Sequence, residues 1–173
     1  KKLQQIPASA GKLIVTDGVF SMRGDICRLP EIVALAEKYG ARVMVDDAHG
    51  FGVLGPGGRG TAAHFVLQDK VDITMLTFSK SLASIGGCML CSKKIYDFVA
   101  HSSRPFIFSA SITPCSAATA LAALQQLEKD PERPTRLMNI AQYFRTKLID
   151  AGVNIIEAPT PIVPIFTYKT LDT

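Results

Sequence analysis

The sequence is poor in the residues that mark several large classes of protein. It has no tryptophan, only four cysteines among 173 residues, and 8% aromatic residues. So few cysteines indicate reduced thiols inside a cell, because small secreted scaffolds carry a dense disulfide framework. The net charge of +4 is spread along the chain without a run of lysine or arginine. We therefore expect no nucleic-acid partner.

Long hydrophobic runs are also missing. The longest apolar stretches fall well short of the ~20 residues that span a bilayer, so we expect no transmembrane segment. Residues 1–11 are polar and lack the apolar centre of a signal peptide, which favours a cytoplasmic protein. A hydrophobic content of 47% with 20% charged residues predicts a globular fold with a sizeable core.

Apolar periodicity and turn residues predict an α/β fold. A strand at 12–16, a helix at 30–39 and a strand at 41–45 form one unit, in which Pro30 begins the helix and Gly40 ends it. The two strands of such a unit lie parallel. The other expected elements are strands at 71–77, 86–91 and 153–157 and helices at 60–67, 92–100, 113–128 and 135–150.

Two of these elements also indicate how their side chains pack. The helix at 113–128 has Thr113 as its N-cap and an alanine- and leucine-rich body, so we expect one long face to be buried. Cys88 and Cys91 match a C-x-x-C motif, but on a strand they point to opposite faces and cannot share a metal or a disulfide. We interpret them as core cysteines rather than a redox or zinc site.

Residues 50–55 (GFGVLG) match the G-x-G-x-x-G fingerprint of dinucleotide-binding proteins. That fingerprint should open a helix whose N-terminus holds the pyrophosphate, whereas a Pro-Gly-Gly sequence continues the loop here. The strand at 71–77 also lacks the acidic end that would bind a ribose. Both features argue against a nicotinamide or flavin site.

Polar side chains follow two predicted strands where each strand ends. Asp46, Asp47 and His49 follow the strand at 41–45, and Thr77, Ser79 and Lys80 end or follow the next one. A metal site is disfavoured, because adjacent strand-end aspartates diverge and no second cluster of ligands is present. Lys80 alone fits an ordinary surface lysine. Together, a lysine amine, a carboxylate and hydroxyls are the groups that pyridoxal 5'-phosphate requires.

The motifs resemble one known family nearly from end to end. They are residues 16–22 (TDGVFSM), 24–25 (GD), 44–50 (MVDDAHG), 58–60 (GRG), 77–80 (TFSK), 106–111 (FIFSAS) and 161–164 (PIVP). In order and spacing they resemble the α-oxoamine synthases, which are fold-type I pyridoxal phosphate enzymes with an aspartate aminotransferase-like fold. The resemblance implies a mostly parallel sheet with flanking helices and the decarboxylative condensation of an amino acid with an acyl-CoA.

The resemblance also implies a role for each site residue. Lys80 would form the Schiff base and act as acid and base, Asp46 would bind the pyridine nitrogen, and His49 would bind the phenolic oxygen. Ser21 would assist His49. Thr77 and Ser79 would hold the phosphate, and Ser109 and Ala110 would reach the cofactor of a second subunit, which implies a homodimer with a shared site.

Within the family, residues 81–87 (SLASIGG) most resemble the serine palmitoyltransferases. This branch implies L-serine and a long-chain acyl-CoA as substrates and 3-ketosphinganine as product, at the first step of sphingolipid synthesis. The alternatives are an 8-amino-7-oxononanoate synthase, a glycine C-acetyltransferase, or a non-catalytic fragment or subunit with this fold.

The resemblance also divides the chain. Residues 1–132 would belong to the large cofactor-binding domain, and residues 133–173 would be a linking helix and the start of a small domain. Family members are about twice the usual single-domain length. We therefore expect this chain to be part of a longer enzyme.

Overall fold

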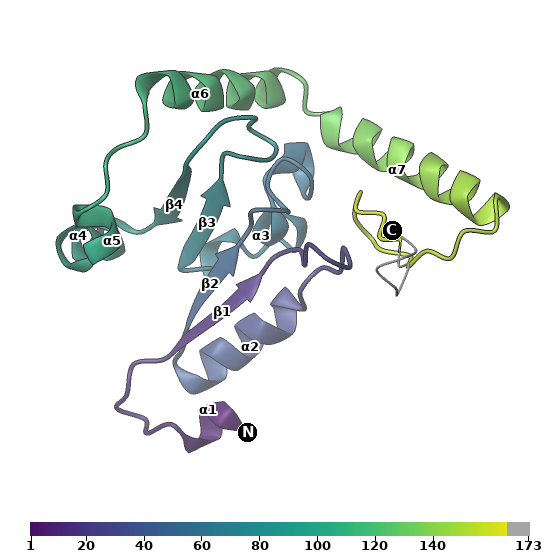
Figure 1. Cartoon of the computed structure of the whole chain (residues 1–173). Helices are drawn as coiled ribbons and strands as arrows, with labels where there is room; N and C mark the ends of the chain where they lie inside the picture. Colours follow the sequence, from purple (N-terminus) through teal and green to yellow (C-terminus); the bar gives the residue numbers. More distant parts are fainter. Residues whose placement is uncertain (166–173) are drawn as a thin grey trace, which may run out of the picture.

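The computed structural model of the protein describes residues 1–165 and has a four-stranded sheet at its centre, in the order β1-β2-β3-β4 (Figure 1). The strands are β1 (Leu13–Asp17), β2 (Arg42–Asp46), β3 (Ile73–Thr77) and β4 (Gly87–Cys91). The first three strands run parallel, and β4 runs antiparallel to β3. The predicted mostly parallel sheet is therefore confirmed.

Helices and short turns make up the other regular elements. They are α1 (Lys2–Gln5), α2 (Leu29–Tyr39), α3 (Thr61–His64), α4 (Lys93–Ser102), α5 (Arg104–Ile107), α6 (Pro114–Lys129) and α7 (Arg133–Asp150), with 3-10 turns η1 (Pro56–Gly58) and η2 (Gln68–Lys70). The short helices α1 and α5 were not predicted, whereas the other five were. Within residues 1–165, no helix is both long enough and apolar enough to cross a membrane.

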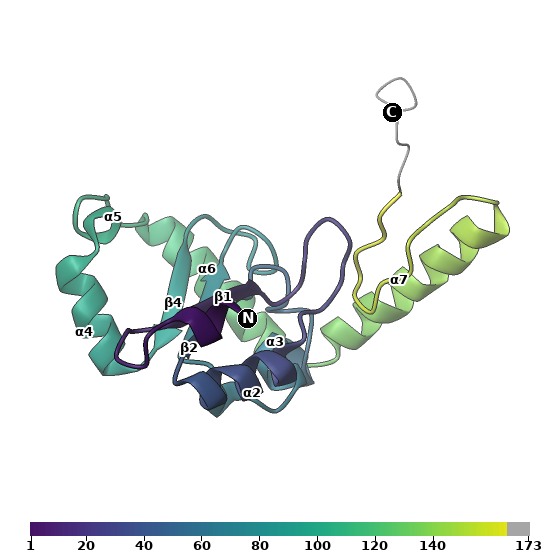
Figure 2. The same cartoon turned by 90° about the horizontal axis from the view of Figure 1, so that it is seen from below.

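The unit of β1, α2 and β2 formed as predicted. Pro30 lies in the first turn of α2, and Gly40 ends the helix at a φ of 61°, a left-handed conformation that glycine adopts without a steric penalty. The helix covers one face of the sheet (Figure 2). The buried cluster between them consists of Cys27, Leu29, Val33, Ala36, Val43, Val45 and Ala62.

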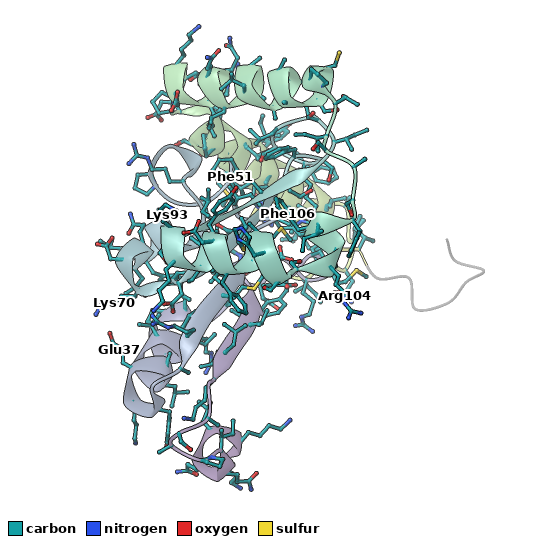
Figure 3. The ribbon with its side chains drawn as sticks, turned by 90° about the vertical axis from the view of Figure 1, so that its left-hand side faces the viewer. Glu37, Phe51, Lys70, Lys93, Arg104 and Phe106 are labelled. Carbon is teal, nitrogen blue, oxygen red and sulfur yellow. The ribbon has the colours of Figure 1, made fainter. Side chains whose placement is uncertain are left out.

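An ion pair joins the end of α2 to η2. The ammonium group of Lys70 lies 2.7 Å from the Glu37 carboxylate, and Figure 3 shows the two side chains at the surface. Because both side chains are more than half exposed, the pair contributes little to stability. The apolar cluster therefore holds α2 in place.

The cysteines occupy different environments from those expected. Cys88 and Cys91 are only half-buried, so their interpretation as core residues is wrong, whereas Cys27 is 4% exposed. The difference arises because β4 is the last strand of the sheet, where its faces are only partly covered. All four thiols are free.

These environments predict the order in which the thiols react. Burial, assisted by the negative charge of Asp47, raises the pKa of the Cys27 thiol to about 11. Because the thiolate is the reactive form, Cys27 should be alkylated last and the exposed Cys115 first at mildly alkaline pH. Timed iodoacetamide labelling followed by peptide mass spectrometry measures the order. Equal rates at Cys27 and Cys115 would contradict this assignment.

Helix α6 begins as predicted but does not bury the expected face. The Thr113 hydroxyl accepts the backbone N–H of Ser116 at 3.2 Å, as an N-cap should. Ala120 is the only buried residue of the helix, and Leu121 is 55% exposed. The prediction of a long buried face is therefore wrong for the described residues. The described contacts of α6 are few: it touches η1, and the Ser84 hydroxyl donates to the Ser116 carbonyl at 2.7 Å.

Within residues 1–165, the strand predicted at 153–157 does not form. The pairing found there is an isolated bridge between Ile155 and Ile165, and a strand needs a continuous partner to satisfy its backbone groups. The segment instead returns alongside α7 (Figure 2). Residues 166–173, the end of the C-terminal part predicted to begin a small domain, lie outside the described residues.

A buried arginine holds the returning segment. Arg145 of α7 is 4% exposed, and its guanidinium donates to the backbone carbonyls of Thr160 and Ile162. The Thr160 hydroxyl in turn donates to the carbonyl of Gly24 at 2.9 Å. These contacts join the C-terminal segment to the loop that follows β1.

Candidate active site

The carboxyl edge of the parallel strands carries the first site residue. Asp46 is the last residue of β2 and lies between Asp17 of β1 and Met75 of β3 in the strand register. Its side chain is half-buried, and one carboxylate oxygen accepts the backbone N–H of Ala48 at 3.1 Å. Open α/β sheets bind ligands at this edge.

The neighbouring aspartate does not share this position. Asp47 is 2% exposed, and both of its oxygens accept hydrogen bonds from Thr61, at 2.8 Å from the backbone N–H and 2.5 Å from the hydroxyl. The two carboxylates therefore have separate partners, which confirms the expectation that Asp46 and Asp47 diverge.

Two hydroxyls lie at the end of the next strand. Thr77 ends β3, and its Oγ1 lies 2.8 Å from the Oγ of Ser79. The Ser79 backbone N–H also points at the Thr77 hydroxyl, at 3.4 Å. Ser79 is exposed and Thr77 half-buried, so the pair offers donors to a ligand at the sheet edge.

Lys80 follows on a tight turn that leads into β4. Its carbonyl accepts the backbone N–H of Ala83 at 3.0 Å, and the Phe78 carbonyl accepts that of Ser84 at 2.8 Å. Ala83 has a φ of 48°, a left-handed conformation that is strained for alanine. The turn presents the Lys80 side chain at the surface, where it is exposed.

His49 is half-buried, and its surroundings favour the neutral imidazole. Burial is the largest influence on its pKa, and the positive charge of Lys80 is the second; both lower that pKa below its ordinary value of 6.5. The carboxylates of Asp17 and Asp46 act in the opposite direction but do not reverse the shift. His49 therefore keeps one N–H donor and one acceptor at neutral pH.

This arrangement predicts how His49 titrates. Because the Lys80 charge lowers the pKa of His49, a Lys80→Met substitution should raise that pKa, so protonation should begin at a higher pH than in the unsubstituted protein. NMR of the imidazole across the acidic range measures this shift in cofactor-free protein. Lys93→Met, on α4, is the matched control and should leave the titration in place. An identical curve for Lys80→Met would contradict the proximity of the two groups.

A cavity of about 900 Å³ lies beside this edge. His49 and Lys80 line it, together with residues of the loop after β2, of α6 and α7, and of the C-terminal segment. Its further lining includes Phe51, Gln126, Leu127, Arg133, Arg136, Leu137, Ile140, Pro161 and Ile162. The structure thus brings a neutral imidazole and a lysine amine into one space with a largely apolar wall.

Three predicted residues lie elsewhere among the described positions. Ser21 is exposed in the loop after β1, and Ser109 and Ala110 are exposed in the segment after α5. None of the three lines the cavity of His49 and Lys80. Their predicted roles stay predictions.

Sequence reasoning did not single out the arginines of the cavity wall. Asp130 orients them: the Arg136 guanidinium donates to both of its carboxylate oxygens, and Arg133 lies 3.3 Å from one of them. Two arginines one helical turn apart after an Asp-Pro step are visible in the sequence. That pattern also suits a solvated helix start, so it does not indicate a site until α7 is placed against η1 and the cavity.

These groups fit pyridoxal 5'-phosphate by their chemistry. The cofactor requires an amine for its aldehyde, a carboxylate for its ring nitrogen, a donor for its phenolic oxygen and hydroxyls for its phosphate. Lys80 has an amine, Asp46 a carboxylate and His49 an N–H donor, and Thr77 and Ser79 form a hydroxyl pair. All five come from the ends of two neighbouring parallel strands and the loops that follow them.

Known proteins resemble this chain along nearly its whole length. The sequence profile of the aminotransferase class I and II family matches residues 1–171. A serine palmitoyltransferase of Sphingobacterium spiritivorum is 48% identical over 165 residues, which are 95% of this chain and 41% of the relative. An 8-amino-7-oxononanoate synthase of Thermosipho melanesiensis is 46% identical over 97% of this chain and 43% of the relative. The chain spans less than half the length of these relatives.

Solved structures show the same likeness. A serine palmitoyltransferase from S. paucimobilis, with a pyridoxal phosphate–myriocin aldimine bound, has a TM-score of 0.89 at 34% identity and covers 98% of this chain and 45% of its own. An 8-amino-7-oxononanoate synthase from Francisella tularensis has a TM-score of 0.71 at 28% identity, over 90% of this chain and 46% of its own. These likenesses confirm the fold-type I architecture and the resemblance that the motifs indicated. The chain belongs to the aminotransferase class I and II family.

Proposed function

We propose that this chain is the central part of an acyltransferase that depends on pyridoxal 5'-phosphate. The enzyme condenses an amino acid, L-serine being favoured, with a long-chain acyl-CoA and releases carbon dioxide and free coenzyme A, which yields 3-ketosphinganine. The observation that carries the proposal is the meeting of His49 and Lys80 in one cavity at the carboxyl edge of the sheet, beside Asp46. The relatives named serine palmitoyltransferase support the choice of substrate.

The strand-end residues have distinct tasks in this proposal. When bound, the cofactor stabilises a carbanion at the substrate Cα through its protonated ring. Asp46 holds the proton on the ring nitrogen, since a half-buried carboxylate favours a neighbouring positive charge. The Lys80 amine would hold the aldehyde of the cofactor and, as a free amine, would take up the proton that leaves the substrate Cα. His49 donates its N–H to the phenolic oxygen, and Ser21 assists it.

The phosphate and a second subunit complete the proposed site. Thr77 and Ser79 donate hydroxyl hydrogens to the phosphate. Ser109 and Ala110 reach the cofactor phosphate in a second copy of the chain. In this homodimer, each active site contains residues of both subunits. Exposed apolar side chains beside them support such an interface: Phe108 is 82% exposed and Phe106, labelled in Figure 3, is 59% exposed.

We also propose a domain division and a cellular location for the chain. Residues 1–132 form part of the large cofactor-binding domain, and residues 133–173 form the linking helix and the start of the small domain. The four free thiols support a cytoplasmic location.

An 8-amino-7-oxononanoate synthase is the second candidate. The relative from Thermosipho melanesiensis supports it, because its identity of 46% is close to the 48% of the serine palmitoyltransferase from Sphingobacterium spiritivorum. Both reactions use the same strand-end residues and differ in the amino acid and the acyl chain.

Product analysis separates these candidates. The complete enzyme that contains this chain is given L-serine, L-alanine or glycine, each with palmitoyl-CoA, a short acyl-CoA or a dicarboxylic acyl-CoA, and the products are identified by mass spectrometry. We expect 3-ketosphinganine from serine with palmitoyl-CoA. Condensation of alanine with a dicarboxylic acyl-CoA alone would assign the second candidate, and no product from any pair would favour a non-catalytic subunit.

A further inference from the structure

Asp47 lies between two proposed site residues but faces away from the cavity. It follows Asp46 and precedes His49 by two positions, yet its side chain is 2% exposed and does not line the space that His49 and Lys80 share. Its backbone N–H donates to the carbonyl of Met75 on β3 at 2.9 Å. The chain is thus anchored to the sheet at the residue that bears this buried carboxylate.

Thr61 binds both oxygens of that carboxylate. Its backbone N–H lies 2.8 Å from Oδ2 and its hydroxyl 2.5 Å from Oδ1 of Asp47, and Thr61 itself is fully buried. Two charge-assisted hydrogen bonds inside the protein fix the position of Thr61 relative to Asp47. The first residue of α3 is therefore held against the end of β2.

Three glycines make room for the Asp47 carboxylate. A Cβ atom added at Gly18, Gly50 or Gly60 would collide with its oxygens. These glycines are the residue after β1, a residue of the loop after β2 and the residue before α3. Three separate chain segments thus close around one carboxylate, which indicates a built site rather than an accidental burial.

The loop between Asp47 and Thr61 connects this arrangement to the segment that contains Lys80. Gly52 donates its N–H to the carbonyl of Gly58 at 2.7 Å, and Gly60 donates to that of Leu54 at 2.8 Å, so the loop is closed on itself. Phe51, labelled in Figure 3, belongs to this loop and lines the cavity. A Cβ atom at Gly52 would collide with the side chain of Ser81, which follows Lys80.

We infer that Asp47 is a positioning residue whose bond to Thr61 fixes the loop of residues 50–60 and, through the contact of Gly52 with Ser81, sets where His49 and Lys80 lie. The inference rests on the proposed function only in giving those two residues their chemistry. A displacement of about 1 Å at reacting groups lowers a rate about 100-fold, so the Asp47–Thr61 hydrogen bonds matter for turnover.

The test compares Thr61→Val with Thr61→Ser in the complete enzyme. Valine keeps the volume and the backbone N–H but removes the hydroxyl bond to Oδ1, whereas serine retains that bond. We expect Thr61→Val to lower kcat about 10- to 100-fold with an unchanged KM, and Thr61→Ser to restore it. Thr146→Val, which removes an exposed hydroxyl bond on α7, is the matched control and should leave kcat unchanged.

A second readout does not depend on catalysis. In cofactor-free protein, a loosened loop admits water and separates His49 from Lys80, so the pKa of His49 should rise toward 6.5 in Thr61→Val but not in Thr61→Ser. An unchanged His49 pKa together with an unchanged kcat in Thr61→Val would overturn the inference. If the unsubstituted enzyme forms no product but the His49 pKa still shifts, the proposed function fails and the positioning role stands.

Discussion

Replacing Lys80 by alanine is expected to abolish turnover in the complete enzyme. The alanine side chain cannot bind the cofactor aldehyde, and it leaves no base beside the substrate Cα. A positioned acid or base contributes on the order of 10^3-fold to a rate, so we expect a loss of at least that size in the formation of the condensation product. Product yield per enzyme, measured by mass spectrometry, tests this.

The control for this substitution is Lys93→Ala. Lys93 is exposed on α4, where its ammonium pairs with Asp97, and it does not line the cavity of Lys80. Loss of an exposed pair of this kind changes little, so its product yield should match that of the unsubstituted enzyme. If Lys80→Ala retained that yield, the assignment of Lys80 as base would be wrong.

The Asp46→Asn substitution is expected to separate cofactor binding from catalysis. Asparagine keeps the shape of the side chain and an oxygen for the backbone N–H of Ala48, so the end of β2 should stay in place. A neutral amide cannot stabilise a proton on the ring nitrogen. We therefore expect the variant to bind cofactor but to release the substrate Cα proton on the order of 10^2-fold more slowly, the typical effect of losing one electrostatic contact.

Exchange of the serine Cα proton for deuterium, followed by NMR, measures that step without the acyl-CoA. Asp97→Asn removes a carboxylate that pairs with Lys93 at the surface of α4, and its exchange rate should equal that of the unsubstituted enzyme. Undiminished exchange in Asp46→Asn would remove Asp46 from the proposed role.

Local patterns in the sequence were sufficient to predict the elements that carry the site. The strand–helix–strand unit was predictable because Pro30 and Gly40 mark the ends of an amphipathic helix between two apolar runs. The divergence of Asp46 and Asp47 was predictable because side chains alternate along an extended chain. These features depend on residues close together in the sequence.

The errors arise where distant segments decide the outcome. The segment at 153–157 has an apolar pattern, but within residues 1–165 it forms a single isolated bridge, and Arg145 binds the following residues to α7. The missing buried face of α6 has the same origin, because apolar residues are buried only where other elements cover them. The partnership of Asp47 with Thr61 spans 14 positions and had no local signal beyond paired aspartates.

The covalent attachment point of the cofactor tests the central claim most directly. The complete enzyme is loaded with pyridoxal 5'-phosphate, reduced with borohydride, digested and mapped by mass spectrometry. Our account predicts the pyridoxyl group on the peptide that contains Lys80. A pyridoxyl group on another lysine, such as Lys70 or Lys93, would contradict it. So would a pyridoxyl group on the corresponding peptide of the Lys80→Ala variant.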